Sequence, residues 1–134
     1  MKLQEKTEVP DELYPLPTRK LGQRRRDLAP EISAAFDAFS QRVFADGALS
    51  AKTKQIIAVA VAHVTQCPYC IRGHTRGALR TGASEAEVME AIWVAAEMRA
   101  GGSYAHSILA IDEMDQARAA TEHQPAAVAD GQHP

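Results

Sequence analysis

The chain is 134 residues long, which suits a single domain with a modest buried core. Its net charge is −2, from 15 basic and 17 acidic residues, so nothing indicates a nucleic-acid-binding surface. No apolar stretch reaches the length of a membrane span, and residues 1–6 lack the apolar segment of a secretory signal. We therefore expect a cytoplasmic protein with no nucleic-acid or membrane partner.

The composition favours helices. Hydrophobic residues make up 46% of the chain but aromatic residues only 5%, and alanine is abundant after Ala51. Close-packed helices use alanine in this way, whereas a β-sandwich needs more β-branched and aromatic residues. We expect an all-α fold.

The N-terminal part is predicted to differ from the rest. Residues 1–29 carry Pro10, Pro15 and Pro17 among charged residues, which predicts an extended arm of the kind that often wraps a neighbouring subunit. A helical domain is expected over residues 30–120. Its first helix should start at Pro30 and end near Gly47, which we expect to cap it in the left-handed conformation.

Three further signals divide the middle of the chain. Ser50 can cap a helix that runs to Gln66 and is apolar almost all round, so this helix should be the central, buried one. The next helix should begin at Cys67 and Pro68, where the missing N–H of proline costs nothing. It should end near Gly82.

The last part is predicted as two helices and a tail. Residues 84–87 form a capping box for a fourth helix, which Gly101 and Gly102 should end. A fifth helix is expected from residue 103 to 120, and a disordered tail over residues 121–134. The residues of this fourth helix that we expect to face the core are Val88, Ile92, Trp93, Val94, Ala95 and Met98.

Both cysteines of the chain lie in one motif, Cys67-Pro-Tyr-Cys70, and His74 follows four residues later. In a helix these three side chains share one face. The helix N-terminus and the imidazole both favour a thiolate, which can attack the O–O bond of a hydroperoxide. The second cysteine then converts the sulfenic acid to a disulfide, and an external dithiol reductant restores the thiols. Cys70 is expected to attack because it is one turn from His74.

Two readings of the motif compete with redox chemistry. Cys67, Cys70, His74 and His63 have ligand types suited to zinc, but structural zinc sites usually draw ligands from two separate pairs and no second pair exists. The cysteines could also be inert packing residues. We expect no metal and no cofactor.

The motif and its surroundings resemble the alkylhydroperoxidase D-like (AhpD-like) proteins of the carboxymuconolactone decarboxylase superfamily. The resemblance spans residues 50–110 and rests on the C-x-x-C-x-x-x-H motif and the helical segments 58–63, 82–87 and 95–106 that frame it. It implies a compact bundle of about five to six helices with the C-x-x-C at the start of one of them. It also implies a homo-oligomer, a trimer or hexamer, which the alanine-rich helices favour as well.

The resemblance assigns roles to five residues. Cys70 matches the peroxidatic cysteine, Cys67 the resolving cysteine and His74 the relay histidine. Gln55 stands where the family carries a glutamate, and a glutamine cannot take up a proton at neutral pH. His63 can compensate if it faces the same pocket; the alternative is a histidine satisfied in the core or at an interface.

These observations predict a thiol-dependent peroxidase that reduces hydroperoxides through its cysteine pair. Gln55 keeps a second hypothesis open, a non-peroxidatic thiol–disulfide redox or stress-sensing module. A third hypothesis is a carboxymuconolactone decarboxylase-like enzyme in which His74 and His63 act and the thiols do not.

Overall fold

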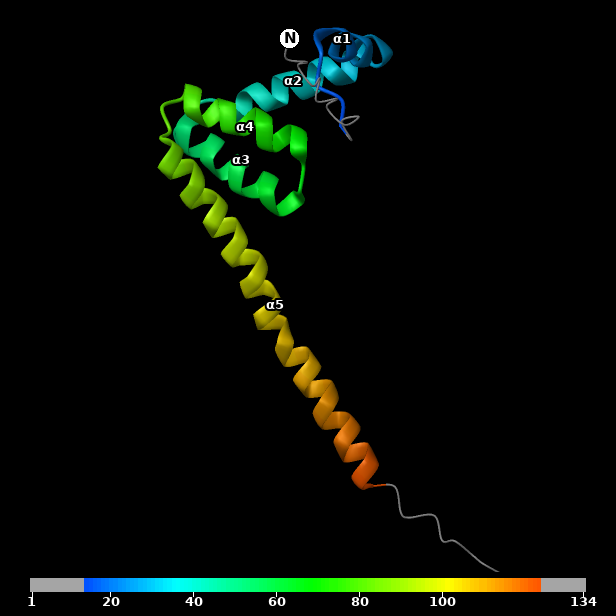
Figure 1. The fold of residues 1–134 in the computed structure, drawn as a ribbon. Coiled ribbons are helices and arrows are strands. Elements are labelled where there is room, and N and C mark those ends of the chain that lie inside the picture. The colour runs from blue at the N-terminus through cyan, green and yellow to red at the C-terminus, as the bar shows by residue number, and fades with distance from the viewer. Residues whose placement is uncertain (1–13, 124–134) are drawn as a thin grey trace, which may run out of the picture. The chain divides into compact units, whose positions relative to one another are not determined.

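The computed structural model describes residues 14–123, and these residues form five α-helices and no strand. The predicted all-α class is therefore confirmed. The helices are α1 (Arg19–Leu28), α2 (Pro30–Phe44), α3 (Ala51–Thr65), α4 (Pro68–Arg80) and α5 (Glu85–Glu122) (Figure 1). The chain divides into two compact units, Met1–Ala95 and Ala96–Pro134. The predictions for residues 1–13 and 124–134 lie outside the described residues.

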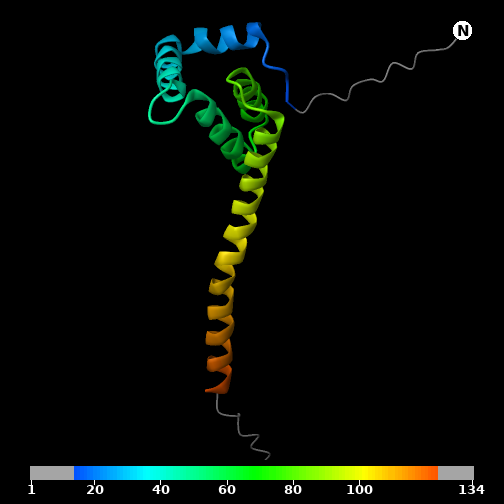
Figure 2. The same cartoon turned by 90° about the vertical axis from the view of Figure 1, so that its left-hand side faces the viewer.

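Helices α3 and α4 form a helical hairpin that contributes two of the four residues of the core cluster of the first unit (Figures 1 and 2). Val59 of α3 and Ala78 of α4 are completely buried where the two helices meet. Ala83 and Val88 complete this cluster. Five of the seven buried hydrophobic residues are alanines, and their small side chains let the helix backbones approach closely.

The start signals read from the sequence are confirmed. The Ser50 hydroxyl accepts a hydrogen bond from the Thr53 N–H at 3.1 Å and caps α3. Ser84 and Glu87 form a reciprocal capping box, with the Ser84 N–H donating to Glu87 at 2.7 Å and the Glu87 N–H donating to Ser84 at 3.1 Å. Glu87 also pairs with Lys52 at 2.7 Å, which ties the first turn of α5 to α3.

The predicted extended arm is wrong for residues 19–28, which form α1. Thr18 caps this helix, its hydroxyl accepting from the Leu21 N–H at 3.3 Å. No proline occurs between Pro17 and Pro30, and the lysine, arginine, leucine and glutamine residues between them are good helix formers. Residues 14–18 remain outside any helix; we call them the N-terminal strap.

The two glycine predictions are also wrong. Gly101 and Gly102 lie inside α5, so the expected fourth and fifth helices are one. Glycine costs a helix about 1 kcal/mol relative to alanine, but it ends a helix only where the backbone turns left-handed. Among the described glycines, Gly82 alone has a positive φ, 93°. Helix α2 ends at Phe44, before Gly47.

Several residues expected in the core are exposed in the single chain. Helix α3 buries Val59 and Ala62 but exposes Ile57, Val61 and Val64, so it is not buried all round. Of the residues expected to face the core from the start of α5, Val88 and Ala95 are buried and Ile92 is partly buried. The remaining three are exposed: Trp93 (69%), Val94 (60%) and Met98 (64%).

None of the helices described in residues 14–123 is long and apolar enough to cross a lipid bilayer.

The close approach of α3 and α4 requires glycine at position 77. A Cβ atom there would lie 2.5 Å from Oε1 and 2.7 Å from Cδ of Gln55. Gly77→Ala should therefore displace the Gln55 side chain and lower the free energy of unfolding by about 1–3 kcal/mol, as other overpacked sites do. Chemical denaturation measures this change.

Gly73→Ala is the matched control, because a Cβ at Gly73 meets nothing within 4 Å in the same helix. This variant should be as stable as the parent protein or up to about 1 kcal/mol more stable, owing to the better helix propensity of alanine. Equal effects of the two substitutions would contradict the packing role of Gly77.

Candidate functional site

The two cysteines lie at the first turn of α4. Cys67 is the N-cap residue and Pro68 occupies the first turn, as the sequence predicts. The Cys67 sulfur accepts a hydrogen bond from the Cys70 backbone N–H at 3.3 Å. Both thiols are reduced and half-buried. The Cys67 sulfur thus accepts the capping hydrogen bond that a serine or aspartate oxygen accepts in most helix caps.

The residue before the motif has an unusual backbone. Gln66 ends α3 with φ 56° and ψ 41°, in the left-handed region. Non-glycine residues adopt this conformation at a cost of roughly 1 kcal/mol or more. Its side-chain amide donates to the His63 carbonyl, which helps to hold the turn. This turn lets Cys67 start α4 two residues after α3 ends.

The hydrogen bonds between the cysteines shift their two pKa values in opposite directions and favour ionisation of Cys67. The hydrogen bond from the Cys70 side chain, together with the Cys70 N–H, lowers the pKa of Cys67 from that of an ordinary thiol. The same side-chain hydrogen bond, together with burial, raises the pKa of Cys70. The positive end of the α4 dipole also favours a thiolate at the N-cap. Ionisation of the pair is therefore easier at Cys67 than at Cys70.

His74 is held one turn further along α4. Its Nδ1 atom donates a hydrogen bond to Oε1 of Gln55 on α3, over 2.9 Å. Because that oxygen can only accept, the proton of the neutral ring lies on Nδ1 and Nε2 keeps its lone pair. The ring of Phe44 stacks on the imidazole, with 5.0 Å between centroids and 30° between planes. His74 can therefore act as a base through Nε2.

The structure brings together Gln55 and His74, as expected from the sequence, and places Cys67 and Cys70 in contact. It does not place His63 with them: the His63 Nδ1 atom donates to the Val59 carbonyl of its own helix at 2.8 Å. Sequence reasoning missed the stacking role of Phe44, which the helical spacing marked only as apolar.

The described residues contain no group of three or more histidine, cysteine, aspartate or glutamate side chains that could hold a metal ion. Cys67, Cys70, His74 and His63 therefore do not converge on a common point, as zinc would require. The site as it stands offers two thiols, one base and no metal-binding cluster.

Comparisons with known proteins show the family to which the chain belongs. The sequence matches the carboxymuconolactone decarboxylase family over residues 30–113. It is 58% identical over 106 residues to a Paracoccus denitrificans protein described as uncharacterized protein 4 in cox locus, covering 77% of this chain and 95% of that protein.

Two solved structures share the fold. A protein from Methanobacterium thermoautotrophicum has a TM-score of 0.58 and 34% identity, over 62% of this chain and 93% of that one. A carboxymuconolactone decarboxylase family protein from Legionella pneumophila, in its apo form, has a TM-score of 0.58 and 31% identity, over 72% of this chain and 87% of that one. The chain belongs to the carboxymuconolactone decarboxylase family, the superfamily of the alkylhydroperoxidase D-like proteins that its cysteine motif resembles.

Proposed function

We propose that the protein is a thiol-dependent peroxidase that reduces hydroperoxides through Cys67 and Cys70. The observation that carries this proposal is the shared hydrogen bonding of the two thiols at the start of α4. It supplies a thiolate and a second thiol within reach of each other. His74, one turn away on the same helix, supplies a base held in a single tautomer by Gln55.

The reaction begins when Cys70 loses its proton to Nε2 of His74. The Cys70 sulfur attacks one peroxide oxygen, the O–O bond breaks, and the leaving alkoxide takes the proton to become an alcohol. The Cys67 thiolate then attacks the sulfur of the sulfenic acid on Cys70, the S–O bond breaks, and the hydroxide leaves as water with a proton from solvent that replaces the one Cys67 released. The products are one disulfide, one alcohol and one water, and an external dithiol reduces the disulfide.

Two features support Cys70 as the attacking thiol, although ionisation is easier at Cys67. Cys70 is four residues from His74 in α4, a spacing that places the two side chains on one face, whereas Cys67 lies outside the helix proper. Cys67 also stores the negative charge that the second step needs. The charge on Cys67 opposes ionisation of Cys70, so the base is required for the first step.

A second candidate function is thiol–disulfide exchange without peroxide chemistry. It is favoured by the neutral amide of Gln55, which orients His74 but adds no negative charge to raise its basicity. In this case the Cys67 thiolate attacks a disulfide of another molecule directly, and His74 need not act.

We also propose that the protein works as a homo-oligomer. The first unit exposes large apolar side chains on α2 and α3 that its small core does not use, a pattern that marks interfaces. Residues 96–122 form a single helix, and one helix has no core of its own to bury its apolar residues. The exposed residues on α2 are Ile32, Phe36, Phe39 and Val43, and those on this part of α5 are Met98, Tyr104, Ile108, Leu109, Ile111 and Met114.

Single alanine variants test the peroxidase and its assignment of roles. Cys67→Ala removes the largest cause of the raised pKa of Cys70, so Cys70 should still consume about one equivalent of peroxide and retain a sulfenic acid. Cys70→Ala removes the hydrogen bond that most lowers the pKa of Cys67. Labelling of Cys67 in this variant should therefore be at least about tenfold slower than labelling of Cys70 in Cys67→Ala. Dimedone labelling with mass spectrometry reads out both, and both variants should lose turnover with dithiothreitol.

The opposite labelling pattern would exchange the two roles while leaving the peroxidase intact. If the parent protein with dithiothreitol consumes no peroxide faster than the double alanine variant, the peroxidase proposal is wrong. Reduction of a small disulfide substrate under the same conditions would then favour the exchange function.

Gln55→Glu tests whether the proton relay limits the rate. A carboxylate against Nδ1 stabilises the imidazolium form and makes His74 a stronger base. We expect the steady-state peroxidase rate to rise by about tenfold or more, part of the roughly 10²–10⁴-fold that a positioned acid–base group contributes. The assay spans pH 6–8.

Gln41→Glu is the matched control, because it adds the same charge on an exposed position of α2. It should leave the rate unchanged. No gain from Gln55→Glu at any pH, in a folded protein, would show that the His74 base does not limit the reaction.

A further inference from the structure

A second site lies on the outer face of α4, away from the residues that bind or activate peroxide in our proposal. Tyr69, Arg72, Gly73 and Arg76 follow one another at the spacing of one helix face, whereas Cys70, His74 and Gly77 follow the adjacent face toward α3. The N-terminal strap covers the outer face. It is held by the Tyr69 hydroxyl, which donates to the Pro15 carbonyl at 2.8 Å. The Tyr14 and Tyr69 rings also meet edge to face, with 6.1 Å between their centroids.

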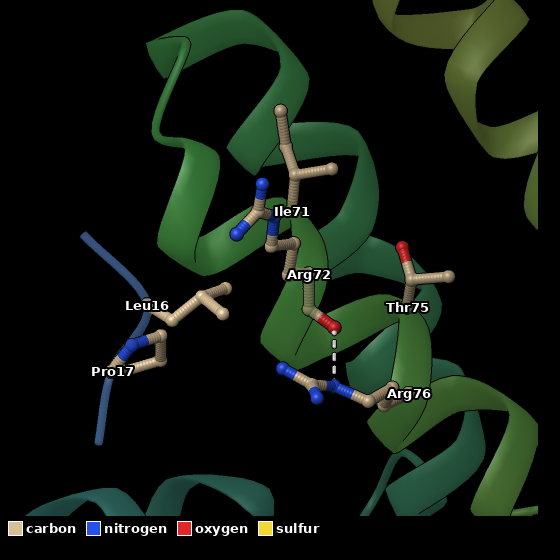
Figure 3. A pocket seen from close by; sticks show the side chains of 6 residues that line it. All are labelled: Leu16, Pro17, Ile71, Arg72, Thr75 and Arg76. Atoms are coloured by element: carbon tan, nitrogen blue, oxygen red, sulfur yellow. Dashed lines mark hydrogen bonds between the residues drawn. The ribbon is translucent and has the colours of Figure 1, made fainter. Parts of the chain in front are cut away.

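Two grooves flank the strap and share the same walls. The first has a volume of about 720 Å³ and is lined by Leu16, Pro17, Ile71, Arg72, Thr75 and Arg76 (Figure 3). The second, of about 500 Å³, continues on the side of α1, where Leu21 and Arg25 join Tyr69 and Arg76. Both volumes fall within the roughly 300–1,000 Å³ usual for sites that bind small molecules.

The charge of these grooves is positive. Arg72 and Arg76 extend from successive turns of α4 toward the strap (Figure 3). Arg25 of α1 lines the second groove. No acidic residue lines either groove, and no carboxylate of residues 14–123 pairs with these three arginines. Arg76 uses only its Nε atom, which donates to the Arg72 carbonyl at 3.2 Å, so its terminal nitrogens stay available.

Apolar side chains form the rest of the walls. Leu16 and Leu21 are each about half exposed, and Ile71 lies beside the Arg72 guanidinium. An apolar chain laid along Leu16 would cover these residues and gain the free energy of their burial. Guanidinium groups bind carboxylates through paired, charge-assisted hydrogen bonds.

We propose that these grooves bind an amphipathic carboxylate, a molecule with one acidic headgroup and an apolar chain of the fatty-acid kind. The headgroup binds Arg76, which lines both grooves, together with Arg72 or Arg25. The chain lies against Leu16 and its apolar neighbours. This site is separate from the thiol chemistry and does not depend on it.

Isothermal titration calorimetry of the full-length, reduced protein with laurate, below its critical micelle concentration, tests the proposal. Laurate should bind with a defined stoichiometry. Arg76→Gln should weaken its binding by about tenfold or more, the expected loss for a charge-assisted contact. Leu16→Ser should weaken laurate as well, and acetate, which has the headgroup without the chain, should bind at least about tenfold more weakly than laurate.

Arg80→Gln is the matched control, because it makes the same change one turn further along α4 on a residue that lines neither groove. It should bind laurate as the parent protein does, and dodecyltrimethylammonium, which carries the opposite charge, should not compete. Far-UV circular dichroism checks that each variant is folded. Absence of laurate binding, or an equal loss in Arg76→Gln and Arg80→Gln, would overturn the proposal. So would equally tight binding of the cationic amphiphile.

Discussion

The hydrogen bonding between Cys67 and Cys70 is the interaction on which the proposed thiol chemistry depends. It exists because α3 ends in a left-handed turn at Gln66 and α4 begins at Pro68, so that Cys67 becomes the helix cap. A sulfur in that position accepts the Cys70 N–H and shares the proton of the neighbouring thiol. One local backbone arrangement therefore favours ionisation of Cys67 over Cys70.

The rest of the fold supports this turn. The hairpin of α3 and α4 is packed through small residues, and Gly77 leaves room for the Gln55 side chain to reach His74. The base is thereby fixed on the same helix as the thiols. Because the helices pack through small residues, the core is small, and Val59 is the largest side chain that is completely buried among the described residues. The homo-oligomer that we propose would cover the exposed apolar faces with a partner chain.

Local signals in the sequence predicted local structure well. Ser50 and the Ser84–Glu87 capping box each mark a helix start because their capping hydrogen bonds are formed within one turn. Pro68 marks one because the first turn of a helix needs no N–H from it. Gly101 and Gly102 misled the prediction because glycine weakens a helix without ending it. The exposure of Trp93 in the single chain could not be predicted, since its apolar character does not say whether the same chain or another one covers it.

The candidate site divides in the same way. The spacing of the motif predicted which residues share the first turns of α4, and the resemblance predicted that Gln55 lies near His74. The position of the charge could not be read from the sequence, because it depends on the direction of a hydrogen bond between two identical side chains. The arginine-lined grooves were missed, although Arg72 and Arg76 at a four-residue spacing were a visible signal.

Site-resolved alkylation across pH tests the central claim most directly. The reduced protein is treated with substoichiometric iodoacetamide between pH 5 and 10, and fragment spectra separate Cys67 from Cys70. We predict that Cys67 reacts first and becomes half-maximally reactive at a lower pH than an ordinary thiol, while Cys70 does so at a higher pH. In Cys70→Ala the Cys67 midpoint should move up. Preferential alkylation of Cys70, or equal midpoints for the two thiols, would contradict the account.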